Sequence, residues 1–282
     1  MVESPTAPRF QLAQELKALR NRAGLTANQA ARLLRCAPET IRRYERGETT
    51  IRYADLLMLM NAYNVRREDD RALLDELREQ ADQPVWWSKY RLPDTMTRLL
   101  GFEAIAQRIQ MFDLAVVPGL LQTADYCRAI IAAIELEASD EQIERWTQLR
   151  LERQQRIGDA RTKPALSVLI GEPAIRCPVG GTAVLREQLE YLLDNPFAFD
   201  LRILPLNVGG HPGGLGSFYV FEFPPKLRKP AVYVEGPVRS LYLDEPEAAR
   251  RATANFDRMW DLALDPDASH KLISTVIEEL QS

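Results

Sequence analysis

The chain lacks the residue patterns that define several large classes of protein. It has only three cysteines, Cys36, Cys127 and Cys177, which lie far apart in the sequence. Isolated thiols of this kind argue against a disulfide framework and are typical of a reducing compartment. The two histidines, His211 and His270, have no neighbours at metal-ligand spacing. We therefore expect neither a metal site nor a bound cofactor.

Segments that would lead the chain into or across a membrane are also absent from the sequence. No apolar run reaches the roughly 18 residues that a membrane span requires. The first eight residues have neither the basic flank nor the apolar stretch of a secretory signal. We expect a cytoplasmic protein that makes no contact with a membrane.

Recognisable catalytic motifs are missing as well. The glycine-rich run Gly209–Gly216 (GGHPGGLG) does not end in the Gly-Lys-Ser/Thr of a phosphate-binding loop, and no serine lies in a nucleophile elbow. Glu172 and Arg176 follow an expected strand, where a functional acid could lie, but a surface or structural ion pair explains them as well. We expect no enzymatic activity, and we interpret Gly209–Gly216 as a flexible loop between strands.

The chain has no overall excess of positive charge, since its formal net charge is -4. The charge is unevenly distributed, however. Residues 1–65 contain ten basic and six acidic side chains, which gives +4 and leaves -8 for the remainder. A basic head joined to an acidic body is typical of a nucleic-acid-binding module carried by a different domain, although an asymmetry of this size also arises by chance.

Three short helices are predicted near the N-terminus. The apolar spacing over residues 10–23 predicts the first helix. Thr26 can cap the start of a second helix over 27–34, because its hydroxyl can accept a hydrogen bond from a free backbone N–H. Pro38 suits the first position of a third helix, which runs to about residue 46 and is ended by a glycine. Two short helices joined by a tight turn indicate a helix-turn-helix.

The third predicted helix has two chemically different faces. Ile41 and Tyr44 share the side that is expected to face the interior. The opposite side carries Glu39, Arg42, Arg43 and Arg46. Arginines on an exposed helix suit the major groove of DNA, where a guanidinium can pair with O6 and N7 of guanine. A solvated charged face, with Glu39 and Arg43 as a surface ion pair, accounts for the same residues about equally well.

The segment Leu25–Gly47 (LTANQAARLLRCAPETIRRYERG) resembles the Xre/Cro/phage-repressor family of helix-turn-helix domains, and its IRRYERG ending is specific to that family. The resemblance implies that some side chains face the bases of DNA and that others contact phosphates. The implied base-facing residues are Glu39, Thr40 and Arg43, and the implied phosphate contacts are Thr26, Arg46 and Arg52, with Arg42 beside them on the exposed face.

The same resemblance implies features of the interior of the head. Arg20 and Glu45 match an ion pair that ties the first helix to the third. Arg35 stands where the family usually has a glycine in the turn, so it is expected to adopt a left-handed conformation at a cost of about 1 kcal/mol. Ala27 replaces the usual glutamine of the family, so one phosphate contact is expected to be missing.

The remaining pattern divides the chain into a head, a linker and a body. Two more amphipathic helices are predicted over 52–63 and 66–81. They are expected to complete the core of the head with Leu57, Met60, Leu73, Leu74 and Leu77. We place the helix-turn-helix domain at 1–81, a proline-containing linker at 82–95 and the body at 96–282.

The body is predicted to be an α+β domain with a mainly antiparallel sheet. Helices are predicted over 96–115, 123–135, 140–158, 182–193, 245–264 and 267–281. Strands are predicted over 165–170, 199–206, 217–223, 231–235 and 239–243. The predicted fold class is therefore an all-α N-terminal helix-turn-helix domain followed by an α+β C-terminal domain.

The body resembles the C-terminal domain of actinobacterial Xre-type regulators of the WhiJ-like or Scr1-type family. The segments that carry the resemblance include PGLLQT (118–123), GEPAIRCPVGGTAVLREQLEYLL (171–193) and VYVEGPVRSLYLDEPE (232–247). The resemblance implies a small BldB-like or Scr2-like partner protein. It also implies that some members of the family act as antitoxins.

These features predict a sequence-specific DNA-binding transcription regulator. We expect a repressor that binds double-stranded operator DNA and whose body receives a signal from the small partner protein. A homodimer is expected, because one such head contacts only a few base pairs. Regulators of this kind usually gain specificity by binding two adjacent half-sites as a dimer. Two alternatives remain. One is an antitoxin-like autoregulator of a toxin–antitoxin pair, and the other is a regulator whose body acts as an enzyme or senses a small molecule through the region of Glu172, Arg176 and His211.

Overall fold

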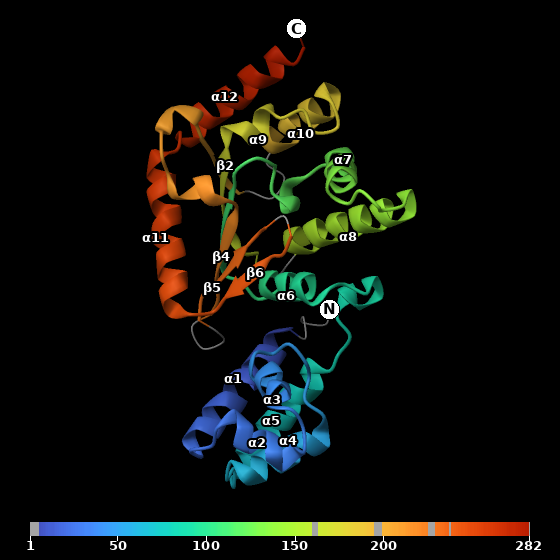
Figure 1. The fold of residues 1–282 in the computed structure, drawn as a ribbon, viewed down its shortest axis with the longest axis vertical. Coiled ribbons are helices and arrows are strands. Elements are labelled where there is room, and N and C mark those ends of the chain that lie inside the picture. Colours follow the sequence, from blue (N-terminus) through green and yellow to red (C-terminus); the bar gives the residue numbers. More distant parts are fainter. Residues whose placement is uncertain (1–5, 160–162, 195–198, 225–228, 237, 282) are drawn as a thin grey trace. The chain divides into compact units, whose positions relative to one another are not determined.

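The computed structural model describes residues 6–159, 163–194, 199–224, 229–236 and 238–281 (Figure 1). By their internal contacts these residues form two compact units. Unit 1 runs to Ile105 and takes in the segment that begins at Phe223, and unit 2 comprises the rest of the chain. The two units are described separately below.

Unit 1 consists of helices, as the sequence predicts for the head. The first three helices are α1 (Thr6–Arg22), α2 (Ala27–Leu34) and α3 (Pro38–Glu45). They are followed by α4 (Tyr53–Ala62), α5 (Glu68–Ala81), the short 3-10 helix η1 (Trp86–Tyr90) and α6 (Asp94–Glu103). The five predicted helices of the head are confirmed, and α2 has the predicted bounds.

The core of unit 1 joins the first five helices. Its most deeply buried side chains include Leu16, Ala30, Ile41, Leu56 and Leu59. Three of the predicted core residues, Met60, Leu74 and Leu77, are buried, and Leu57 packs against the same cluster. The prediction for Leu73 is wrong, because this side chain remains 47% exposed. The buried face of α5 is formed by Leu74, Leu77 and Ala81, a spacing that turns Leu73 outward.

Unit 2 is built around a mixed six-stranded sheet in the order β3-β2-β1-β4-β5-β6. The strands are β1 (Arg108–Asp113), β2 (Ala165–Gly171), β3 (Asp200–Leu204), β4 (Phe218–Glu222), β5 (Ala231–Val234) and β6 (Leu241–Leu243). The pairs β1–β2 and β2–β3 are parallel, whereas β1–β4, β4–β5 and β5–β6 are antiparallel. The predicted α+β body with a mainly antiparallel sheet is confirmed.

Helices supply the crossovers that the parallel strands need. The helices α7 (Ala124–Ile134) and α8 (Asp140–Asp159) connect β1 to β2, while α9 (Glu172–Arg176) and α10 (Thr182–Asp194) connect β2 to β3. The chain then adds α11 (Pro246–Leu262) and α12 (Pro266–Glu279) after the last strand. In Figure 1, α11 runs along one face of the sheet, and α7 and α8 lie on the other side.

One prediction for the body is wrong. The sequence predicted a single helix over 96–115, but α6 ends at Glu103 and the chain continues into β1. The apolar residues of 108–113 fit a buried helix or a buried strand equally well by their spacing. Pairing with β2 on one side and β4 on the other decides for the strand, and both partners are distant in the sequence. Tertiary contacts therefore override the local pattern.

The glycine-rich run between β3 and β4 is packed in part rather than simply flexible. It contains a 3-10 turn over Pro212–Leu215, and Gly213 is buried there. A Cβ atom at Gly213 would lie 2.3 Å from the ring of Phe112, so no larger side chain fits without movement. The backbone N–H of Gly213 also donates to the Met259 Sδ atom at 3.1 Å. This glycine is required for close approach to the sheet.

A buried carboxyl group lies at the end of β1. Asp113 is 1% exposed, and its Oδ2 atom accepts a hydrogen bond from the Tyr219 hydroxyl at 2.8 Å. Burial, assisted by the neighbouring Glu235 carboxylate, raises the pKa of Asp113 to about 7, although hydrogen bonds from Tyr219 and Ser217 act in the opposite direction. Since the pKa of an aspartate in an unfolded chain is about 3.9, the folded protein holds this proton more tightly.

The pKa of Asp113 predicts a pH dependence of stability. Between about pH 4 and pH 7 the unfolded chain releases this proton while the folded protein keeps it, so the free energy of unfolding falls as the pH rises. Asp113→Asn should remove this contribution, which is on the order of 4 kcal/mol across that range. Urea unfolding of the full chain from pH 4.5 to pH 8 measures it. The exposed Asp261→Asn is the control, and an identical pH slope for Asp113→Asn and the wild type would contradict the assignment.

Candidate nucleic-acid interface

The turn between α2 and α3 follows from local capping interactions. Thr26 begins α2 with a reciprocal capping box: its hydroxyl accepts from the backbone N–H of Gln29 at 3.2 Å, and the Gln29 side chain accepts from the backbone N–H of Thr26 at 2.8 Å. Ala37 is extended, as expected of a residue before a proline, and Pro38 opens α3. Thr26 and Pro38 therefore determine locally where α2 and α3 begin.

Arg35 ends α2 in a left-handed conformation, with φ 52° and ψ 42°. The predicted conformation is confirmed, and it stores about 1 kcal/mol of strain because Arg35 has a Cβ atom where a glycine would have none. The N–H of Arg35 reaches back to the carbonyls of Ala31 and Arg32. These hydrogen bonds close the helix end and turn the chain toward α3.

An ion pair fixes α3 against α1. The Arg20 guanidinium donates to both carboxylate oxygens of Glu45, with Nε–Oε1 and Nη2–Oε2 distances of 2.5 and 2.9 Å. Arg20 Nη1 also donates to the carbonyl oxygen of Leu25 at 2.7 Å, just before α2 begins. Both side chains are nearly covered, at 12% and 7% exposure. The predicted pair is confirmed, and it links α1, the start of α2 and α3 through one guanidinium.

The orientation of α3 divides its residues as the sequence predicts. Ile41 and Glu45 are buried. The exposed side chains are Glu39, Arg42, Arg43 and Arg46, with exposures of 57%, 48%, 44% and 34%. These four predicted DNA-binding residues therefore lie together on one face of one helix, and Thr40 is half-buried beside them.

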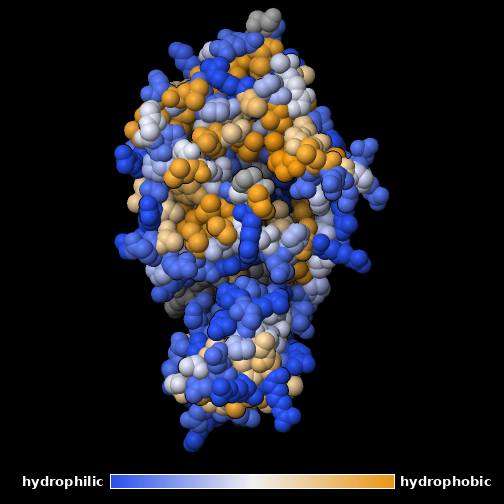
Figure 2. Space-filling model, viewed as in Figure 1, coloured by the Kyte–Doolittle hydropathy of each residue, from blue (hydrophilic) through white to orange (hydrophobic). Residues whose placement is uncertain are grey.

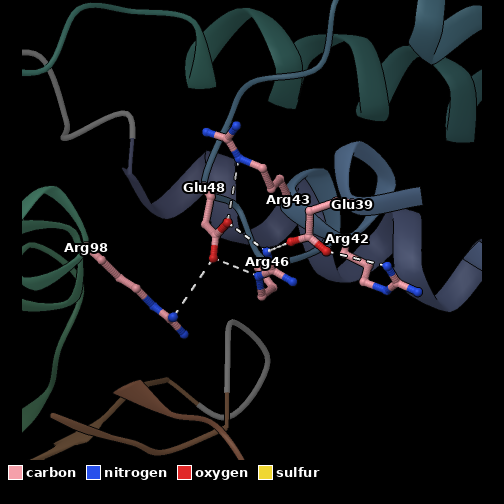
Figure 3. Close-up of polar contacts among 6 residues, drawn as sticks. All are labelled: Glu39, Arg42, Arg43, Arg46, Glu48 and Arg98. Carbon is pink, nitrogen blue, oxygen red and sulfur yellow. Dashed lines mark hydrogen bonds and ion pairs between the residues drawn. The ribbon is translucent and has the colours of Figure 1, made fainter. Parts of the chain in front are cut away.

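The exposed arginines of α3 are paired within the protein (Figure 3). Glu39 contacts Arg42 at 3.4 Å and Arg46 at 2.5 Å, so the pairing of Glu39 with Arg43 that the sequence suggested is wrong. The hydrogen bond from Arg46 holds the pKa of Glu39 below its usual value. Arg43 instead lies 3.8 Å from Glu48, which follows the helix.

Glu48 is the second acid of this group. It accepts two hydrogen bonds from Arg46, at 2.7 and 2.9 Å, and it lies 3.9 Å from Arg98 of α6. The sequence reasoning identified neither Glu48 nor Arg98. Glu48 could have been found from its place shortly after the end of the helix, but Arg98 is 50 residues further along the chain and carries no local signal.

The two remaining predicted residues lie at the starts of other helices. Thr26 is exposed at the N-terminus of α2. Arg52 precedes α4, is 79% exposed and pairs with Asp55 at 2.9 Å. Asp55 also accepts from the Tyr44 hydroxyl at 3.2 Å, so it connects α3 to the start of α4. A helix N-terminus carries free N–H groups that favour a phosphate.

The acidic and basic residues considered for a small-molecule site are held in ion pairs. Glu172 accepts from Arg176 at 2.7 Å and from the backbone N–H of Leu206 at 2.9 Å, and Arg176 also pairs with Glu279. Partial burial raises the pKa of Glu172, but these two hydrogen bonds outweigh it and hold the pKa below its usual value. This geometry fits the alternative expectation, in which Glu172 and Arg176 form a structural ion pair.

Two further features are absent from the residues that the structure describes. Within those residues, no group of three or more His, Cys, Asp or Glu side chains could hold a metal ion. No helix among them is both long enough and apolar enough to cross a membrane.

Two segments of the chain match known protein families. Residues 11–74 match a family described as Helix-turn-helix domain. Residues 96–275 match a family described as Domain of unknown function (DUF5753). No curated protein and no solved structure matches the chain significantly.

Breaking the Arg20–Glu45 pair should destabilise unit 1. Arg20→Met leaves the Glu45 carboxylate buried without its partner, which costs on the order of 3 kcal/mol. The double variant Arg20→Met/Glu45→Met should recover part of this loss, because it removes the unpaired charge. Amide hydrogen exchange of peptides that cover α1 to α3 measures the effect. Arg42→Ala, which breaks an exposed pair, is the control, and equal exchange rates for Arg20→Met and Arg42→Ala would refute the structural role.

Proposed function

The chain belongs to the family of the Domain of unknown function (DUF5753) and carries a helix-turn-helix domain, and on this basis we propose that it is a sequence-specific DNA-binding transcription regulator. In this proposal α3 enters the major groove of the operator. The protein is a regulator rather than an enzyme, and it acts in the cytoplasm.

The observation that carries the proposal is the exposed arginine face of α3. Its opposite face is anchored by Ile41 and Glu45, so the side that remains available presents Arg42, Arg43 and Arg46. A guanidinium pairs in bidentate geometry with O6 and N7 of guanine, which gives it base specificity. We assign this role to Arg43, with Glu39 and Thr40 beside it.

Phosphate contacts are assigned to residues around this face. Arg46 at the end of α3, Arg52 before α4 and Thr26 at the start of α2 would hold the DNA backbone and set the register of α3. The net charge of +4 on residues 1–65 supports this assignment, since phosphate contacts supply most of the affinity that does not depend on sequence.

The body is proposed to receive a signal from a small partner protein and to pass it to a repressor head. Unit 2 has exposed apolar side chains that would suit such a partner. Leu206, which precedes the turn around Gly213, is 66% exposed, and Leu215 at the end of that turn is 99% exposed. On the face drawn in Figure 2, apolar side chains gather over unit 2, whereas unit 1 is mostly hydrophilic.

Replacing the base-reading arginine should reduce specificity. On an operator selected from randomised duplexes, Arg43→Ala should cost about 1–3 kcal/mol of binding free energy, with little change on a scrambled duplex. Arg46→Ala and Arg52→Ala should weaken binding to both duplexes and flatten the salt dependence. Fluorescence anisotropy measures both affinities.

The matched control for these variants is Arg186→Ala, which makes the same charge change on α10 of unit 2. Equal losses on operator and scrambled duplex for Arg43→Ala would refute its base-reading role. A wild-type protein that selects no sequence at all would refute the proposed function.

The regulator is expected to be a homodimer. One helix-turn-helix reads few base pairs, and a two-fold dimer places two recognition helices about one turn of DNA apart. Light scattering after size exclusion should give twice the chain mass of 32.1 kDa, alone and with operator. A monomer mass at micromolar protein under both conditions contradicts this expectation.

A further inference from the structure

Three guanidinium groups converge on one carboxylate beside the recognition helix. Arg43 and Arg46 reach Glu48 from α3, and Arg98 reaches it from α6 (Figure 3). All four residues belong to unit 1. The Nε and Nη2 atoms of Arg46 hold both carboxylate oxygens of Glu48 in fork geometry. A guanidinium binds a phosphate in the same way.

Guanidinium groups surround the Glu48 carboxylate. Three arginines face Glu48, and Arg46 is shared between Glu48 and Glu39. Glu48 is 26% exposed and Arg46 34%, so the group lies at the surface, where a ligand can reach it. Clusters of arginine are a usual means of binding anionic groups. The geometry is that of an anion site in which a side chain of the protein occupies the place of the anion.

The position of Arg98 in this group is fixed by packing. Arg98 lies over the ring of Phe102, one turn further along α6, at 5.3 Å. The Phe102 ring packs against Phe10 at 5.8 Å, and Phe10 fills the space beside Gly47, where a Cβ atom would lie 2.9 Å away. Gly47 follows Arg46, the residue that caps the end of α3. A continuous set of aromatic contacts therefore holds α6 next to the end of the recognition helix.

We propose that Arg98 of α6 joins Arg46 in holding one phosphate of the DNA backbone, and that Glu48 occupies this phosphate site in the free protein. This inference rests on the proposed function. When DNA binds, the phosphate replaces the Glu48 carboxylate. The release of Glu48 also frees Arg43 to reach a base.

The assignment extends the DNA-binding surface beyond the helix-turn-helix. Residue 98 lies outside the matched segment 11–74 and inside the matched segment 96–275. The domain of unknown function, which matches residues 96–275, would therefore contribute one contact to DNA. Any change in the body that displaces α6 would alter DNA affinity through Arg98.

The first test removes the internal competitor. Glu48→Gln keeps the size of the side chain and removes its charge, so it should raise affinity for operator and scrambled duplex by about two- to fivefold at low salt. Arg98→Met should lower affinity for both duplexes and reduce the slope of log K against log salt by about 1. The controls are Glu68→Gln and Arg67→Met, which make the same charge changes at exposed positions of unit 1.

The second test uses the wild-type protein and does not depend on the folding of any variant. A dicarbonyl reagent that modifies arginine is applied with and without operator, and the modified peptides are quantified by mass spectrometry. Bound operator should protect Arg98 and Arg46 several-fold and leave Arg67 unchanged.

The outcomes separate this inference from the proposed function. Affinity of Glu48→Gln equal to that of Glu68→Gln overturns the role of Glu48. Unchanged affinity of Arg98→Met, or modification of Arg98 that operator does not reduce, overturns the role of Arg98. In each case wild-type binding to operator preserves the proposed function. A wild-type protein that binds no duplex overturns both.

Discussion

The orientation of the recognition helix depends on the ion pair between Arg20 and Glu45. A guanidinium on α1 binds both oxygens of a carboxylate on α3 and also the backbone before α2, so three segments are held by one side chain. A buried pair of this kind adds little net stability compared with apolar side chains, but breaking it leaves an uncompensated charge. Its effect is to favour one arrangement of α3. With Glu45 turned inward, Arg42, Arg43 and Arg46 must face outward.

The arginines that face outward are not free in the absence of DNA. Glu39 and Glu48 neutralise them locally, which limits repulsion among like charges and keeps the side chains close to the geometry that a phosphate or a guanine requires. Exposed pairs contribute little to stability, so DNA can displace the carboxylates at small cost. In the proposed complex, the affinity for DNA would therefore reflect a competition between internal carboxylates and external phosphates, and α6 would take part in it through Arg98, which contacts Glu48 in the free protein.

Local signals allowed the recognition motif to be predicted from sequence. Thr26, Pro38 and the glycine after α3 determine helix ends through hydrogen bonds and backbone angles within a few residues, and the family resemblance supplied the Arg20–Glu45 pair and the left-handed Arg35. Features that depend on distant contacts were missed. The strand β1 is defined by partners far away in the sequence, and Arg98 meets Glu48 only because aromatic packing brings α6 to the end of α3. The DNA-binding residues themselves stay a prediction.

The central claim is that an arginine of α3 reads a guanine in the major groove, and methylation interference tests it most directly. Methyl groups placed at guanine N7 of the operator block the acceptor that a guanidinium uses. The account predicts that methylation of particular guanines in each half-site prevents binding of the wild-type protein. It further predicts that Arg43→Ala loses sensitivity at one of these guanines while keeping the others. Binding that no guanine methylation affects, or an interference pattern that Arg43→Ala leaves unchanged, would contradict the account.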